Sequence, residues 1–311
     1  MRADFVNEVA RVLDIKRRDL VEKDLILHQM LTDLSQESFF SDNFLFKGGT
    51  CLIKCYFGYL RFSEDIDFTW KDQSVFEGKS QKQIRKYLSD VINKTGDVFE
   101  AVAEKRGLDF KCVKSNRDYV ELGGNDKTCT LKIWYDSEIL KRRTFPKVQI
   151  NFVETMCFSP KKGELSGLLT GKHEELEGLF PEETAEYAKR IAFSVYDIRE
   201  TLCEKVRALL TREGTKARDF LDVYLIWKRF GLRPEDEEKC IIGKIDFSLR
   251  LYAKYRQHLK QKVALLKSGK LFDWGTEKEL LLSDMDEGDF YKFLGGFQEF
   301  LKKAVKAVGY G

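Results

Sequence analysis

Two short motifs that lie close together in the sequence contain residue types that could do chemistry jointly. Gly48 and Gly49 form the centre of the tetrapeptide KGGT, and a glycine turn at the start of a helix presents backbone N–H groups to phosphate. Asp65 and Asp67 follow in a stretch that alternates like a strand, so their side chains project to the same side. Two carboxylates on one face repel unless a cation lies between them, and Mg²⁺ commonly binds through one or two carboxylates together with substrate phosphates. The motifs together predict a site for a nucleoside triphosphate with Mg²⁺ or Mn²⁺.

Each motif alone is unspecific, because a glycine pair often marks only a turn and a DxD pair often lies on a solvated strand face. Their order and spacing are more informative. The stretch resembles the nucleotidyltransferase signature of the DNA polymerase beta superfamily, in which a glycine turn and a short helix precede a strand with DxD or DxE. KGGT followed by RFSEDID at 61–67 is more closely similar to the AbiEii/AbiGii family, the nucleotidyltransferase toxins of abortive-infection and toxin–antitoxin systems, which include the MenT enzymes.

The composition is that of an ordinary soluble protein and sets limits on other functions. The chain has 311 residues, 43% hydrophobic and 34% charged, with a net charge of +3 that does not by itself indicate a polyanionic partner. The charged N-terminus does not suit a signal peptide, and no apolar run is long enough to span a membrane, so we expect a cytoplasmic protein. The seven cysteines form no CxxC pair and are expected to be reduced core residues. The three histidines are too scattered for a zinc site or a Ser-His-Asp triad.

The segments around the two motifs predict the elements that must position them. Apolar residues recur at helical spacing over about residues 4–34, which predicts two helices before the glycine turn. The turn Glu22–Asp24 matches a segment that precedes KGGT in the family, although its residues alone indicate a solvated helix turn. Between 108 and 154 the period becomes alternating, which predicts the rest of a sheet. We expect strands at 108–112, 129–135 and 147–152, with a hairpin turn at 123–126.

The strand at 147–152 bears on the metal site. In polymerase-beta-like transferases a third carboxylate on a later strand completes that site, and the AbiEii pattern usually has an acid where this chain has Asn151. An asparagine can ligate a metal through its carbonyl oxygen but cannot act as a base. The resemblance therefore places Asn151 near the metal as a neutral ligand. Glu154 is the nearest acid in sequence, and on a regular strand its side chain would point to the other face.

A second cluster resembles the same family. The family has a helix with E-x-x-x-x-K followed by K-A-x-D-x-x-D, and this chain has Glu200 with Lys205 and then Lys216, Asp219 and Asp222. An apolar stripe predicts a helix over about 198–210. A lysine beside such a stripe can simply extend along it to water, but the run of basic residues that follows favours contact with phosphate.

The C-terminal part is rich in basic residues. The span from Arg250 to Lys270 contains no acid and interleaves its basic side chains with Tyr252 and Tyr255, and three further lysines lie at 302, 303 and 306. Basic charge with aromatic rings is typical of phosphate contact and base stacking. A solvated basic helix face explains the same pattern.

The sequence thus predicts an α/β fold with a polymerase-beta-like nucleotidyltransferase core over residues 1–160, including its N-terminal helices. A largely helical region over 161–311 is expected to complete the cleft. The resemblance implies transfer of a nucleoside monophosphate from an NTP to a hydroxyl, with the 3′ end of tRNA suggested by the MenT enzymes, and an antitoxin protein as partner. The alternatives are another acceptor, such as a small molecule or a protein, and a non-catalytic nucleotide-binding module.

The motifs and the resemblance assign roles to individual residues. Nucleotide contacts are expected from Lys47, Gly48, Gly49, Thr50, Arg61, Ser63, Lys205 and Lys216. Catalytic roles are expected for Asp65, Asp67, Lys205 and Asp219, and the metal is expected at Asp65, Asp67 and Asn151. Asp219 is expected to orient Lys216 or Arg61.

Overall fold

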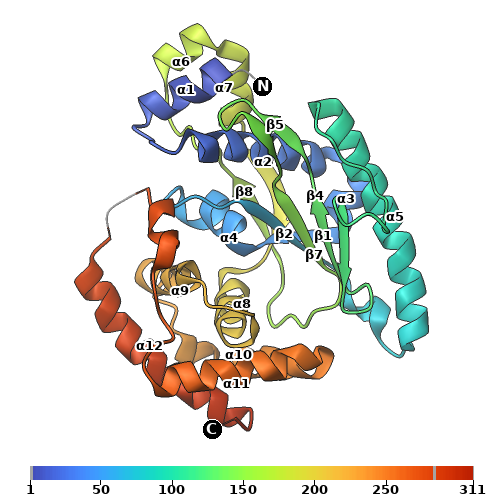
Figure 1. The fold of residues 1–311 in the computed structure, drawn as a ribbon, viewed down its shortest axis with the longest axis vertical. Coiled ribbons are helices and arrows are strands. Elements are labelled where there is room, and N and C mark those ends of the chain that lie inside the picture. Colours follow the sequence, from blue (N-terminus) through green and yellow to red (C-terminus); the bar gives the residue numbers. More distant parts are fainter. Residues whose placement is uncertain (1–2, 283–284, 311) are drawn as a thin grey trace. The chain divides into compact units, whose positions relative to one another are not determined.

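The computed structural model describes residues 3–282 and 285–310 and divides into two compact units (Figure 1). The first unit comprises Met1–Glu154 and Pro160–Val195, and the second comprises Thr155–Ser159 and Tyr196–Gly311. The boundary that the sequence suggested at residue 160 differs from this division. The reason is that β8 and β9, which both follow Pro160, belong to the sheet of the first unit.

The first unit is built on a mixed seven-stranded sheet, in the order β3-β4-β7-β2-β1-β9-β8. The α/β class predicted from the sequence is confirmed. A separate two-stranded sheet pairs β5 with β6. The strands are β1 Phe44–Lys47, β2 Asp65–Trp70, β3 Val120–Gly123, β4 Thr128–Lys132, β5 Tyr135–Ser137, β6 Arg142–Thr144, β7 Lys147–Asn151, β8 Lys161–Leu165 and β9 Ile191–Val195.

Helices cover one face of the large sheet. The shared core contains Leu27 from α2, Leu88 from α5, and apolar sheet residues such as Phe68 and Ile150. Because strand residues alternate between faces, the neighbours of these apolar residues point to the opposite side. The helices of this unit are α1 Ala3–Val12, α2 Arg18–Gln36, α3 Ser38–Asn43, α4 Gly48–Cys51 with a π-helix at Leu52–Phe57, a 3₁₀ turn at Gln73–Phe76, α5 Gln81–Arg106, α6 Glu174–Leu179 and α7 Pro181–Ala188.

The face opposite that core carries polar side chains at its centre, and register shows which ones. β2 is antiparallel to β1, with Lys47 opposite Asp67, and parallel to β7, with Gln149 opposite Asp67. Residues directly opposite one another on neighbouring strands lie on the same face. We call the group formed by Lys47, Asp65, Asp67, Thr69 and Gln149 the polar face.

The strand predictions were mostly correct. The hairpin at 123–126 is confirmed, because β3 and β4 pair across it and Asn125 and Asp126 both have positive φ angles. The strand expected at 108–112 was wrong. There the chain makes only an isolated bridge between Asp109 and Trp134, although Phe110 is buried as the alternation indicated.

The second unit is helical. Its helices are α8 Ile198–Thr211, α9 Ala217–Phe230, a 3₁₀ turn at Pro234–Glu237, α10 Glu238–Leu251, α11 Ala253–Lys267, a 3₁₀ helix at Gly275–Leu280 and α12 Glu287–Ala307. An aromatic cluster joins α9 to α12, in which Trp227 stacks on Phe293 with ring centroids 5.3 Å apart. Among the residues that the structure describes, no helix has both the length and the apolar character needed to cross a bilayer.

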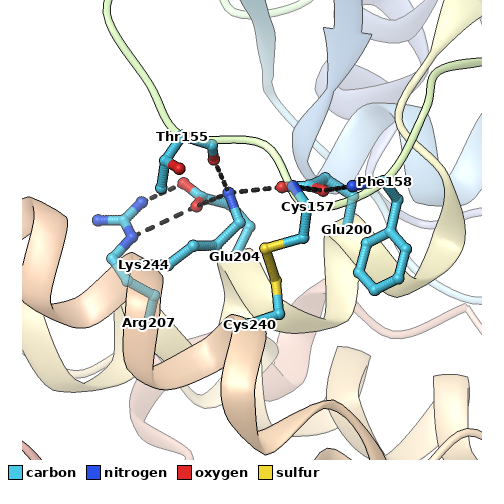
Figure 2. Close-up of a disulfide and its surroundings, with 8 residues drawn as sticks. All are labelled: Thr155, Cys157, Phe158, Glu200, Glu204, Arg207, Cys240 and Lys244. Atoms are coloured by element: carbon cyan, nitrogen blue, oxygen red, sulfur yellow. Dashed lines mark hydrogen bonds and ion pairs between the residues drawn. A yellow bond between two sulfur atoms is a disulfide. The ribbon is translucent and has the colours of Figure 1, made fainter.

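Cysteine pairing corrects one sequence expectation. Cys157 and Cys240 form a disulfide with Cα atoms 6.1 Å apart, so these two are not free core thiols (Figure 2). The bond fastens the short segment 155–159 to α10. Glu200 reinforces the attachment by accepting hydrogen bonds from the Cys157 and Phe158 N–H groups, each at 2.8 Å. Lys244 adds a bond of 2.6 Å to the Thr155 carbonyl.

Candidate active site

The glycine turn and the DxD strand touch each other. Gly48 has a φ of 78°, and a Cβ atom added there would stand 2.2 Å from Asp67 Oδ2. Only glycine therefore allows both the left-handed backbone and the close approach of this carboxylate. The predicted juxtaposition of the two motifs is present in the structure, with Asp65 and Asp67 both half-buried on the polar face.

Three further residues with predicted nucleotide contacts gather at the same turn. A Cβ on Gly49 would lie 2.9 Å from Arg61 Nη2 and 3.2 Å from Ser63 Oγ, so the second glycine gives room to both side chains. Thr50 Oγ1 lies 2.8 Å from Ser63 Oγ and also hydrogen-bonds the Asp65 carbonyl. The hydroxyl of Thr50 thus joins the start of α4 to the start of β2.

The residue beside Asp67 on β7 differs from the one expected. Register places Gln149 opposite Asp67 and Asn151 opposite Thr69, one pair further along the strand. Asn151 therefore lies on the correct face but is displaced from the DxD pair, and Gln149 is the closer amide. Both are neutral, so β7 itself supplies no third carboxylate.

The Glu154 side chain points to the polar face, so the expectation that it points to the other side was wrong. Strand β7 ends at Asn151, so the alternation used for that prediction stops before Glu154. The Glu154 carboxylate lies 2.6 Å from Lys47 Nζ and 2.9 Å from Thr69 Oγ1. Sequence analysis missed this contact because a bend after the strand, rather than strand periodicity, directs the side chain.

The polar face fits a divalent cation that shares its coordination with a substrate. Asp65 and Asp67 offer hard oxygen ligands on one side of β2, and the Asp65 carboxylate makes no hydrogen bond or ion pair within the described residues. No group of three or more His, Cys, Asp or Glu side chains in that part of the chain is arranged to hold a metal alone. Two carboxylates suit Mg²⁺, which typically takes further ligands from water and phosphate.

The second predicted cluster contains several ion pairs between α8 and α9. Lys205 Nζ lies 2.7 Å from Asp219 Oδ1 and 2.7 Å from Asp222 Oδ2, and Arg212 approaches Asp219 at 3.0 Å. Asp219 and Asp222 are 1% and 0% exposed. Burial alone would raise the pKa of Asp219, but the charges of Lys205 and Arg212 outweigh it and hold that pKa below its usual range.

The expected role of Asp219 was to orient Lys216 or Arg61. In the structure Asp219 engages Lys205 and Arg212, and Lys216 directly precedes the first turn of α9. Lys205, which was expected to contact phosphate, forms ion pairs with both Asp219 and Asp222. The eight residues assigned to nucleotide contact thus separate into two sets. Six of them, Lys47, Gly48, Gly49, Thr50, Arg61 and Ser63, gather in the first unit, whereas Lys205 and Lys216 belong to the second.

A buried network that sequence analysis interpreted as solvated lies beside the π-helix. Asp24 is 3% exposed and accepts hydrogen bonds from Tyr187 at 2.6 Å, Tyr59 at 2.8 Å and Lys54 at 3.1 Å. The expectation of a solvated turn at Glu22–Asp24 was therefore wrong. The spacing of apolar residues within one helix cannot reveal a partner as distant in sequence as Tyr187.

Comparison with known families identifies the class of protein. The sequence matches the family model described as nucleotidyl transferase AbiEii toxin of type IV toxin–antitoxin systems over residues 29–307. The chain belongs to this family and is a nucleotidyltransferase. Membership implies an antitoxin as partner.

Two crystal structures from Helicobacter pylori are similar to the chain over nearly its whole length. One is JHP933, which matches with 15% identity and a TM-score of 0.43 over 93% of this chain and 94% of its own. The other is named as a candidate nucleotidyltransferase and matches with the same identity and TM-score over 94% of this chain and 99% of its own. No curated protein matches the sequence.

Proposed function

We propose that the protein transfers a nucleoside monophosphate from an NTP to a hydroxyl at the 3′ end of an RNA, with tRNA as the expected acceptor, and releases pyrophosphate. The observation that carries the nucleotide part is the contact between the glycine turn and the DxD strand at Gly48 and Asp67. That contact brings a phosphate-binding turn within reach of two carboxylates on one strand face.

Residues of the first unit have separate roles in the proposed reaction. The N–H groups at Gly48 and Gly49, together with Arg61, bind the triphosphate, and Asp65 and Asp67 hold Mg²⁺. When bound, Mg²⁺ neutralises charge on the phosphates. The oxygen of the acceptor hydroxyl forms a bond to the α-phosphorus and loses its proton to solvent, while the bond between the α-phosphorus and pyrophosphate breaks. This reaction depends mainly on positioning and electrostatics. Lys205 and Lys216 belong to the second unit, and two aspartates already engage Lys205.

A basic groove in the second unit supports an RNA acceptor. It has a volume of about 500 Å³ and lies between α11 and α12. Lys267 and Lys306 are exposed there and have no partner among the described residues. Lys302 and Lys303 form surface ion pairs of 2.7 Å with Glu299 and Glu238, of the kind that contributes little energy and can exchange for phosphate. Tyr310 also lines the groove and offers an aromatic ring on which a base can stack.

The structure narrows the basic span that the sequence suggested. Lys262 is 3% exposed and donates to Thr215 Oγ1 at 2.6 Å, and burial lowers its pKa to about 8. Arg256 donates to the Leu249 carbonyl at 3.1 Å, whereas Arg250 forms a surface ion pair of 3.0 Å with Asp246. Lys262 and Arg256 thus have structural partners, which favours the lysines of the groove for RNA contact.

The acceptor proposal is tested by RNA binding at several salt concentrations. Lys267→Glu combined with Lys306→Glu should weaken binding and reduce the slope of log K against log salt by about one for each phosphate that the protein no longer binds. Lys260→Glu combined with Lys270→Glu, exposed positions that do not line the groove, is the charge-matched control. An equal change in slope for both pairs would show that the groove is not a distinct site.

The reaction itself is tested by incubating the protein with each labelled NTP, Mg²⁺ and either total RNA or total protein. Label should pass from one or more NTPs to RNA. Label on protein, or on a small molecule added in place of RNA, would replace the acceptor while leaving the enzyme class intact. Production in a bacterial host, where the cytoplasm supplies NTP and RNA, should slow growth, and Asp67→Asn should relieve that effect.

A further inference from the structure

Glu154 and Lys47 form an ion pair on the polar face that is almost closed to water. Their side chains are 9% and 5% exposed, and the bonded atoms are 2.6 Å apart. Thr69 Oγ1 lies 2.9 Å from the same Glu154 oxygen. Three side chains from β1, β2 and the segment after β7 therefore converge on the face that also carries Asp67.

The backbone after β7 is held so that Glu154 must point this way. Gln73 Nε2 donates to the Phe152 carbonyl at 3.0 Å, and Gln73 Oε1 accepts from the Glu154 N–H at 2.8 Å. The same amide nitrogen lies 2.6 Å from the Trp70 carbonyl. One glutamine thus fixes the bend, and the position of the Glu154 carboxylate is set by the fold.

Lys47 is the residue whose position this carboxylate controls. It directly precedes the glycine turn and stands opposite Asp67 in the β1–β2 register. A lysine ammonium sits on a flexible four-carbon stem, so its place on a surface depends on what holds it. A buried ion pair is weak evidence for a purely stabilising role, because withdrawing both charges from water offsets much of their attraction.

We propose that Glu154 is a positioning residue, which holds the Lys47 ammonium on the polar face so that it meets the phosphates of the bound nucleoside triphosphate. The proposal rests on the nucleotide site proposed above and adds a residue from outside both family motifs. Glu154 acts through Lys47 and does not touch the nucleotide. The proposal predicts that the contribution of Glu154 to ligand affinity depends on the number of phosphates in the ligand and not on its base or ribose.

The test compares the affinity for a non-hydrolysable NTP analogue with that for the corresponding NMP, in Mg²⁺ and without acceptor. Glu154→Gln keeps the size and a hydrogen-bond acceptor but removes the charge. It should lower affinity for the analogue about tenfold and leave affinity for the NMP unchanged. Glu154→Asp keeps the charge on a shorter side chain, so its affinity for the analogue should lie between those of the wild type and Glu154→Gln. Glu121→Gln is the matched control, since it breaks an exposed 2.6 Å pair with Lys132 in the same sheet.

A second variant decides the matter if Glu154→Gln fails to fold. The double substitution of Lys47→Met and Glu154→Leu removes both charges and leaves neither unpaired, so its thermal midpoint should stay near that of the wild type. Its ratio of analogue to NMP affinity should still fall. An unchanged ratio in a folded variant overturns the positioning role. A wild-type protein with no preference for the analogue over the NMP would instead overturn the proposed nucleotide site.

Discussion

Two clusters in this protein combine aspartates with lysine, and they differ in whether a carboxylate remains without a partner among the described residues. On the polar face, Asp65 is half-buried and its carboxylate has no partner within the described residues. Between α8 and α9, Asp219 is buried and is held by both Lys205 and Arg212. Residue type and charge are similar, but the polar face keeps one carboxylate, that of Asp65, without a partner among the described residues, whereas Asp219 already has two cationic partners.

The difference shows that a motif match and an available site are separate properties. Both clusters resemble the family pattern, and both place acids near basic residues. Removing one partner of a saturated buried set leaves an uncompensated charge, whereas removing an uncommitted carboxylate leaves the remaining contacts intact. The clusters should therefore respond to substitution in opposite ways, one in stability and the other in chemistry.

The largest effect on stability is expected at the α8–α9 cluster. Asp219→Asn leaves Lys205 and Arg212 with less negative charge in a buried setting, so the free energy of unfolding of the second unit should fall by about 3–5 kcal/mol. Chemical denaturation followed by tryptophan fluorescence, to which Trp227 and Trp274 of the second unit contribute, measures it. Asp65→Asn should change that free energy very little. Equal losses in both variants would remove the distinction between the clusters.

The next largest contribution to stability is expected from the disulfide, which also lies within the second unit. Cys157 and Cys240 are 83 residues apart in sequence, and bonds that close loops of this size typically stabilise by about 2–4 kcal/mol. Cys240→Ser, compared with the wild type under oxidising and reducing conditions, tests this. The wild type should lose stability on reduction and the variant should not. If reductant affects the two proteins alike, the pair is not bonded in solution.

A glycine substitution tests the active site through transfer activity rather than stability. Gly48→Ala would place a methyl group 2.2 Å from Asp67 Oδ2, so the carboxylate must move. Displacement of a catalytic group by about 1 Å can cost about 100-fold in rate, and a loss of that size is expected here. Gly231→Ala is the control, because its φ of 69° is similarly strained but no atom lies within 4 Å of the added methyl group. Transfer activity should survive that change.

The smallest predicted effect concerns pH and the buried network of the first unit. Burial and the nearby Lys54 ammonium lower the pKa of His28 to about 3. The unfolded chain takes up this proton below about pH 6.5 while the folded protein does not, so stability falls as the pH drops. His28 alone should cost about 2 kcal/mol between about pH 7 and pH 5. His28→Gln should flatten this dependence, and an equally steep curve in the variant would assign the loss to other groups.

The part of the site that sequence could predict is the part encoded within one short stretch. KGGT, Arg61, Ser63 and DxD lie within about 20 residues, and strand alternation correctly placed Asp65 and Asp67 on one face. Glu154 was misplaced because its direction depends on a bend held by Gln73. Asp24 was misjudged because its partners, Tyr59 and Tyr187, come from distant segments.

The fold was predictable to a similar degree. Alternation gave β4 and β7 because each buries every second residue, and it failed at 108–112, where Phe110 is buried without a ladder of backbone partners. The region from residue 161 onward was expected to be largely helical, but it begins with β8 and later adds β9, which its polar residues obscured. The exposed residues of β8, including Lys161 and Glu164, carry the polarity of an edge strand that pairs only with β9.

The most direct test of the central claim is the transfer of labelled nucleotide by Asp65→Asn. This substitution removes an uncommitted charge from the polar face and keeps the side chain's shape, so the protein should fold with an unchanged thermal midpoint. Transfer from NTP to RNA should fall by about 1,000-fold or more, because the variant has no carboxylate at this position to bind the metal. Transfer at the wild-type rate by a folded Asp65→Asn protein would show that the glycine turn and the DxD strand are not the nucleotide site.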